Sequence, residues 1–249
     1  MVNETGYLQE HLGPKRAALS LVIPMTVVYT VILLTGVVGN ICTCVVIARN
    51  KYMHTATNYY LFSLAVSDVL LLVLGIPQEI YVSWQSYPYI FGECFCVIRG
   101  LTSETSTNAS ILTITAFTVE RYLAICHPLR AHRMSQLSRA LKIIVFIWVV
   151  ATLCSIPVVV QLGIVYQLNG NETAILESAT CGIKRVLPYI FEASALLFFL
   201  LPLTVISFLY ILIGLKLRRF TAGHKDSTPE LASCRSTNQS SRRAVVKML

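Results

Sequence analysis

The chain has 249 residues, of which 55% are hydrophobic and only 13% charged, and its mean hydropathy is +0.66. Soluble domains carry about 25% charged residues, so this composition excludes an ordinary soluble protein and indicates a membrane protein. Eight cysteines in this length are too dilute for a disulfide scaffold, and the net charge of +8 points to nucleic acid only if the basic residues cluster.

A transmembrane helix needs about 20 mostly apolar residues to cross about 30 Å of hydrocarbon. Five runs of that length occur in the chain, at residues 19–48, 59–82, 94–125, 141–164 and 186–217. The first run is too long for a cleaved signal peptide. The third is the least apolar, because it holds Glu104, Asn108 and many hydroxyl groups, which are costly against lipid but tolerable against other helices. We therefore expect an all-α membrane protein with this third helix at the centre of the bundle.

The segments outside these runs differ in charge. If residues 1–18 are extracellular, most of the 20 Lys and Arg fall in the inner segments, as the positive-inside rule requires. The net charge therefore reflects topology, which indicates a lipid bilayer as partner and no nucleic acid. The sequons at Asn3 and Asn171 then lie outside the cell, and we expect both asparagines to be glycosylated.

The last part of the chain changes character twice. Residues 218–243 are polar and rich in Lys and Arg, and apolar residues begin again after them. We expect residues 19–217 to form the transmembrane bundle. Residues 218–249 are then expected to form a cytoplasmic loop and the start of a sixth helix.

Short motifs follow one another in a characteristic order. Glu120-Arg121-Tyr122 stands at the inner end of the third run, although an Arg beside a Glu at a membrane boundary is also typical of an interfacial pair with no further role. The other motifs are Gly39-Asn40, Leu64-Ala65-Val66-Ser67-Asp68, Cys126-His127-Pro128-Leu129, Trp148 with Pro157, and Pro202 with Tyr210. With these residues the chain resembles a rhodopsin-like (class A) G protein-coupled receptor.

Three longer stretches narrow this resemblance. Residues 54–64, Trp84 with Tyr87-Pro88, and residues 112–122 are similar to the arthropod pyrokinin, pheromone-biosynthesis-activating and capa peptide receptors, which are relatives of vertebrate neuromedin U receptors. The resemblance implies a plasma-membrane receptor with an extracellular N-terminus. Its expected ligand is an amidated neuropeptide with Arg in its C-terminal motif, and its expected cytoplasmic partner is a heterotrimeric G protein of the Gq type.

The family has seven helices, so the resemblance implies a seven-transmembrane-type bundle truncated after the fifth helix and the start of the sixth. The chain is then either a piece of a longer receptor or a truncated splice form that acts as a non-signalling partner of the full-length receptor. A small transporter is a further hypothesis, but the chain has no internal repeat and its charged positions match the receptor pattern. The sequence shows no nucleophile, phosphate loop or metal-ligand spacing, so we expect neither an enzyme nor a metal centre.

The resemblance also implies a switch toward the G protein at the inner end of the bundle. Glu120 and Arg121 are expected to form an ionic latch whose rearrangement exposes Arg121. Tyr122 completes the motif, and Tyr210 on the fifth helix is expected to hydrogen-bond in the opened state. Such a bistable element can be biased by a ligand.

Two further sites follow from the same resemblance. Asp68, in the middle of the second run, and its neighbour Asn40 are expected to form a sodium and water site, the only cofactor-like site implied. Cys96 and Cys181 are expected to form a disulfide between the second outer loop and the third helix. Cys94 competes with Cys96 for this bond, but only Cys96 has the family's spacing to Arg121.

Two acidic residues in the outer half of the bundle point to the ligand. Glu79 and Glu104 are intramembrane carboxylates that favour a cationic partner, especially an Arg that can form a two-point contact. The family comparison places the Arg of the peptide near these acids. The alternative is internal: Arg99, or protonation of one acid, satisfies them without a ligand.

Overall fold

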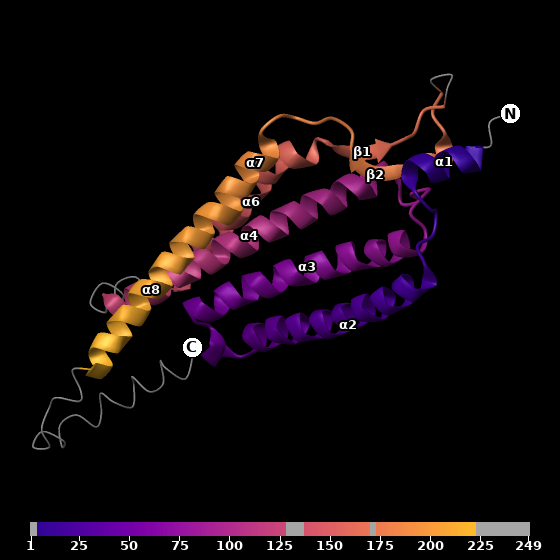
Figure 1. Ribbon diagram of the computed structural model, residues 1–249. Coiled ribbons are helices and arrows are strands. Elements are labelled where there is room, and N and C mark those ends of the chain that lie inside the picture. Colours follow the sequence, from indigo (N-terminus) through magenta and orange to yellow (C-terminus); the bar gives the residue numbers. More distant parts are fainter. Residues whose placement is uncertain (1–3, 128–136, 170–172, 223–249) are drawn as a thin grey trace, which may run out of the picture.

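The computed structural model describes residues 4–127, 137–169 and 173–222. Five long helices run side by side through most of the molecule (Figure 1). They are α2 (Leu19–Arg49), α3 (Ala56–Trp84), α4 (Gly92–Cys126), α6 (Leu137–Val159) and a fifth built from α7 (Ile190–Ala195), the π-helical segment η3 (Leu196–Leu200) and α8 (Leu201–Ala222). Each of the five is long and apolar enough to cross a membrane. The prediction of five membrane-crossing helices is confirmed.

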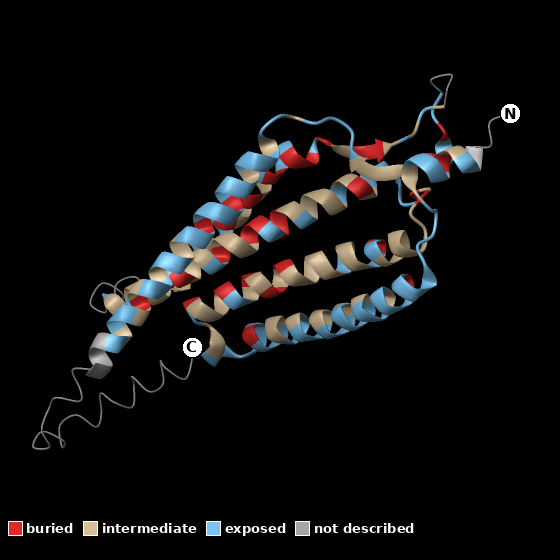
Figure 2. Ribbon diagram, in the orientation of Figure 1, coloured by how far each residue is buried: buried red, intermediate tan, exposed pale blue. Residues whose placement is uncertain are grey.

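Helix α4 lies at the centre of the bundle. It packs against α3, α6 and α8, whereas α2 packs against α3. Figure 2 shows many buried positions along α3, α4 and α6, while α2 is mostly exposed. The buried side chains of α4 include polar ones, such as Asn108, which donates a hydrogen bond to Ser155 of α6 at 3.3 Å. The expectation that the most polar helix is the central one is confirmed.

Small residues and polar contacts hold the helices together. Ala109 of α4 and Ala151 of α6 are fully buried and belong to one apolar cluster with Ile147. Trp148 of α6 donates its ring N–H to Ser63 of α3 at 3.0 Å. Membrane helices gain little from the hydrophobic effect, so close approach of small residues and hydrogen bonds of about 0.6 kcal/mol each stabilise their association.

A cap of short elements covers one end of the bundle (Figure 1). It consists of α1 (Glu4–Leu12), strand β1 (Leu162–Val165), the 3-10 turn η2 (Leu176–Ser178) and strand β2 (Thr180–Ile183). The strands pair antiparallel, with Ile164 opposite Cys181. At the other end of the bundle, α2 and α3 are joined by the 3-10 turn η1 (Lys51–Met53).

Helix α1 is docked onto the rest of the cap. Leu8 of α1 forms a buried cluster with Tyr87 and Ile175, and the Tyr7 hydroxyl donates to the carbonyl oxygen of Leu168 at 3.0 Å. From the sequence, residues 1–18 were expected to be extracellular and no helix was predicted in them, so α1 was not predicted. Its apolar face is short, and it is buried only because residues far away in the sequence cover it.

The fourth helix ends earlier than predicted. The run at residues 141–164 was expected to be helical throughout, but α6 ends at Val159 and its last apolar residues belong to β1. Ile164 is only 7% exposed, because it is covered by the cap and does not face lipid. Apolar content alone cannot separate a buried strand from the end of a membrane-crossing helix, so this boundary was wrong.

The fifth helix is shifted relative to the run at residues 186–217. It begins at Ile190, after Pro188, which has no backbone N–H and restricts the residue before it. The segment before this helix contacts the residues that follow α6: Leu187 donates its backbone N–H to the Gln161 side chain at 2.8 Å. At its C-terminal end α8 continues to Ala222, so the helix extends beyond residue 218, where the cytoplasmic loop was expected to begin.

We predict that Ala151→Leu destabilises the bundle. Ala151 is fully buried against α4, so the added side chain must displace neighbouring atoms, and overpacking typically costs about 1–3 kcal/mol. The thermal unfolding of the detergent-solubilised protein measures the effect. Val149→Leu is the matched control, because Val149 lies on the same helix but is 52% exposed. Equal melting temperatures for the two variants would contradict the packing of α6 on α4.

Candidate functional site

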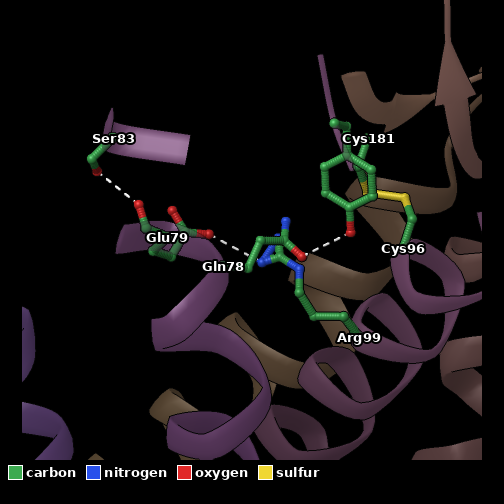
Figure 3. Close-up of polar contacts among 7 residues, drawn as sticks. Gln78, Glu79, Ser83, Cys96, Arg99 and Cys181 are labelled. Atoms are coloured by element: carbon green, nitrogen blue, oxygen red, sulfur yellow. Dashed lines mark hydrogen bonds and ion pairs between the residues drawn. A yellow bond between two sulfur atoms is a disulfide. The ribbon is translucent and has the colours of Figure 1, made fainter. Parts of the chain in front are cut away.

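The half of the bundle under the cap, the half that is expected from the sequence to be outer, holds a carboxylate on α3 that is paired inside the protein. Glu79 lies near the outer end of α3, and its Oε1 accepts a hydrogen bond from Nη1 of Arg99 on α4 at 3.0 Å (Figure 3). The side chains of this ion pair are 48% and 25% exposed, respectively. The sequence left open whether Arg99 forms an ion pair with one of the outer acids. In the structure it forms one with Glu79.

The outer carboxylate of α4 has a neutral partner. Oε1 of Glu104 accepts a hydrogen bond from the Ser194 hydroxyl of α7 at 3.1 Å. Within the described part of the chain the ion pairs are Glu79 with Arg99 and Glu93 with Lys184, so neither includes Glu104. Intramembrane carboxylates usually pair with a cation, so the neutral partner of Glu104 sets it apart from Glu79.

A buried hydrogen bond stands beside the Glu79–Arg99 pair. The Tyr89 hydroxyl donates to Oε1 of Gln78 at 3.0 Å, and both side chains are buried. Burial raises the pKa of Tyr89, while the nearby positive charge of Arg99 lowers it by a smaller amount. Because Tyr89 also donates its backbone N–H to Ala179 at 2.7 Å, this contact joins the outer end of α3 to the cap.

The expected disulfide joins the cap to α4. Cys96 and Cys181 are bonded, with their Cα atoms 5.8 Å apart, and Cys96 is fully buried (Figure 3). The competitor, Cys94, is a free and exposed thiol. The bond lies three residues before Arg99, so it anchors the turn of α4 from which Arg99 reaches Glu79.

The inner charged residues have separate partners. Oε1 of Glu120 accepts a hydrogen bond from the Tyr60 hydroxyl at 3.0 Å, and the Arg121 guanidinium donates to the hydroxyl of Thr57. Arg121 also lies over the Phe117 ring, 5.1 Å from its centroid. Consecutive residues on a helix do not face each other. The described structure therefore lacks the expected Glu120–Arg121 latch, and the switch role of both residues stays a prediction.

The two tyrosines assigned to the switch lie on different helices. Tyr122 contacts His127 edge-on, with ring centroids 5.7 Å apart. Tyr210 lies on α8 and is 45% exposed. Their switch roles remain predictions.

The sodium site expected at Asp68 and Asn40 stays a prediction. Asn40 donates its side-chain N–H to the carbonyl oxygen of Gly36 at 2.9 Å, so it is engaged within its own helix and not with Asp68. The hydroxyls of Ser67, Ser106 and Ser110 are buried and without a hydrogen-bond partner in the described chain. A carboxylate and hydroxyl oxygens are donors that hard cations take, so these residue types fit sodium.

Several partners in these sites were not predicted from the sequence. Tyr60 and Thr57 hold the inner charges from α3, and Lys184 pairs with Glu93 beside the disulfide. A tyrosine and a threonine in the inner half of the second run were a weak signal, since both are common in membrane helices. The predicted glycosylation sites, Asn3 and Asn171, lie outside the described residues.

Residues 39–249 match the model of the family described as 7 transmembrane receptor (rhodopsin family). The chain belongs to this family. It is therefore a multi-pass membrane protein of a receptor family, not of an enzyme class. The resemblance carried by the motifs around Asp68, Arg121 and Pro202 is confirmed.

The sequence of this chain is similar to those of peptide receptors from insects and mammals. The pyrokinin-1 receptor of Drosophila melanogaster is 54% identical over 217 residues, which are 87% of this chain and 49% of that receptor. Neuromedin-U receptor 2 of Mus musculus is 43% identical over 246 residues, which are 98% of this chain and 60% of that receptor. The chain thus spans between about half and three fifths of the length of these two relatives.

We predict that Cys96→Ser lowers the amount of receptor chain at the cell surface. The bond fixes β2 to α4, and loss of a native disulfide from a small domain typically costs about 2–5 kcal/mol. Surface labelling of an epitope-tagged chain measures the effect. The control is Cys94→Ser, which removes a free thiol two residues away and is expected to leave surface expression unchanged. A larger loss for Cys94→Ser would contradict the pairing of Cys96 with Cys181.

Proposed function

We propose that this chain belongs to a plasma-membrane receptor for an amidated neuropeptide of the pyrokinin or neuromedin U type. In this proposal a cationic residue of the peptide binds in the outer half of the bundle, and a G protein of the Gq type binds at the inner end. Support comes from the names of the relatives, which are receptors for pyrokinin and neuromedin U. The observation that carries the proposal is Glu104, a carboxylate below the cap with a neutral hydrogen-bond partner.

The outer site is suited to an Arg-containing peptide. Glu104 and Glu79 lie on adjacent helices, α4 and α3, and both belong to the outer half of the bundle. An Arg that forms a two-point, partly desolvated contact with a carboxylate interacts more strongly than an exposed single-contact pair. An amidated C-terminus adds no negative charge that would be repelled by these acids.

The orientation follows from charge and from the disulfide. The cap carries the Cys96–Cys181 bond, and disulfides are typical of extracellular compartments. The opposite end carries Arg49 and Lys51 around η1, and basic residues are typical of the cytoplasmic side. We therefore propose that the N-terminus and the cap are extracellular.

The inner contacts correspond to a resting state in this proposal. Tyr60 and Thr57, both on α3, hold Glu120 and Arg121 of α4. Activation would release Arg121 from Thr57 so that it faces the G protein. A sodium ion at Asp68 belongs to the same proposal, with the buried serine hydroxyls of α3 and α4 as additional oxygen donors.

The ligand-charge proposal predicts that Glu104→Gln weakens peptide binding. Truncating one side of a buried, hydrogen-bonded charge pair commonly costs about 2–5 kcal/mol, and each 1.4 kcal/mol is about tenfold in affinity. Glu79→Gln is expected to act in the same direction. Calcium release and labelled-peptide binding are measured in cells that express the longest polypeptide its gene encodes, with an amidated pyrokinin as the probe.

A double-mutant cycle separates charge recognition from folding. Replacing the peptide's Arg by citrulline should weaken binding to the unsubstituted receptor strongly and to the Glu104→Gln variant much less. Glu177→Gln is the control, because Glu177 is an exposed acid of η2 in the cap. Equal losses with citrulline in all receptors, at matched surface expression, would mean that the peptide's cation binds elsewhere.

The resting-state proposal predicts that Tyr60→Phe raises ligand-independent signalling. The substitution removes the hydroxyl that donates to Glu120, and hydrogen bonds to charged groups contribute about 1.5–3 kcal/mol. Basal inositol phosphate accumulation measures the shift toward the active state. Tyr59→Phe is the matched control, since the hydroxyl of Tyr59 is not part of the Glu120 contact. A basal signal that falls with Tyr60→Phe alone would contradict a resting role for this bond.

A further inference from the structure

The two outer carboxylates are not equivalent. Glu104 accepts from a neutral hydroxyl, whereas Glu79 already has a cation, the guanidinium of Arg99. An arriving cationic ligand therefore meets an unneutralised carboxylate at Glu104. At Glu79 it meets a carboxylate that is neutralised by the protein itself, so it has to displace Arg99 to use this site.

The Glu79–Arg99 pair is easy to exchange. It is formed by one nitrogen and one oxygen at 3.0 Å, not by the parallel two-point contact that Arg can make with a carboxylate. Its two side chains are 48% and 25% exposed, so water screens the attraction. Exposed ion pairs typically contribute little to stability. A ligand that forms a less exposed contact with Glu79 can replace Arg99 at low cost.

The backbone around the pair is held in place from both sides. The Cys96–Cys181 bond anchors α4 three residues before Arg99, and Tyr89 donates to Gln78, the residue before Glu79 (Figure 3). Arg99 and Glu79 therefore cannot separate by a movement of the cap without breaking buried contacts. The exchange that remains available is a rotation of the Arg99 side chain away from Glu79.

We propose that Arg99 is an internal competitor for the ligand's cation at Glu79. It occupies Glu79 in the free receptor and is displaced when the peptide's Arg binds, so it sets the affinity for cationic ligands. This inference rests on the proposed function, because it requires a cationic peptide in the outer site. It goes beyond that function because Arg99 lowers the affinity for a cationic peptide, whereas the two acids raise it.

The proposal predicts that Arg99→Gln tightens peptide binding. Removing the competitor should increase the affinity for an amidated, Arg-containing pyrokinin by about 2- to 5-fold, the range that corresponds to an exposed ion pair. Affinity for the same peptide with citrulline in place of Arg should stay unchanged. Arg99→Lys, which keeps the charge, should bind both peptides as the unsubstituted receptor does, and it reports on any loss of folding at this position.

Two further receptor variants test whether the gain in peptide affinity comes from Glu79. In a Glu79→Gln receptor, adding Arg99→Gln should give no further gain, because the site for which Arg99 competes has been removed. Arg16→Gln is the control for a general loss of positive charge at the outer surface, since Arg16 lies over Trp84 and is not part of the pair. Binding is measured on the longest polypeptide the gene encodes and is normalised to receptor number at the surface.

Distinct results would overturn distinct claims. If Arg99→Gln weakens both peptides by the same factor while Arg99→Lys does not, Arg99 is a structural clamp between α3 and α4 and the competitor proposal is wrong. The same conclusion follows if Arg16→Gln gives an equal gain. If the unsubstituted receptor at the surface binds the Arg and citrulline peptides equally well, the cationic-ligand function itself fails, and the competitor proposal fails with it.

Discussion

Polar side chains within the membrane-crossing part of α4 constrain the arrangement of all the other helices. A carboxylate or amide that faces lipid cannot satisfy all of its hydrogen-bonding groups within its own helix, so a helix that carries several of them is favoured where protein surrounds it. α4 meets this constraint by lying among α3, α6 and α8, where Asn108 contacts Ser155 and Glu104 contacts Ser194. The outer and inner charged sites follow from this position, because each contains a charged residue of α4 that contacts a neighbouring helix.

Hydropathy predicted the number and order of the helices because lipid selects long apolar runs regardless of what the rest of the chain does. It failed where protein, not lipid, covers the apolar residues. Ile164 is buried in the cap and was assigned to a helix, while Leu8 is buried only because Tyr87 and Ile175 cover it. Tyr89 and Cys96, which pack against Ile164, and both residues that cover Leu8 are more than 60 positions away in the sequence, so no local pattern contains them.

The charged residues of the candidate site stand out in the sequence, whereas most of their partners do not; Arg99 was one of two alternatives and was not assigned to either acid. A carboxylate or an Arg within a membrane-crossing run is costly, so Glu79, Glu104 and Arg121 stand out from the sequence alone. Adjacency in sequence then suggested that Glu120 pairs with Arg121, but consecutive side chains on a helix diverge, and Glu120 contacts Tyr60 of α3. Arg99 and Glu79 are 20 residues apart on two helices, and their contact depends on how α3 lies against α4.

The outer and inner sites share the same two helices, and those helices differ in stiffness. α3 contains Pro77 two residues before Glu79, and a proline within a helix removes a hydrogen bond and allows bending. α4 contains no proline between Glu104 and Glu120, about 24 Å apart at 1.5 Å per residue. A displacement of Glu79 can therefore be absorbed at Pro77, whereas a displacement of Glu104 moves a continuous helix. The two outer carboxylates therefore differ in how they are connected to the inner end of the bundle: Glu79 lies beside a proline, whereas Glu104 belongs to the same uninterrupted helix as Glu120.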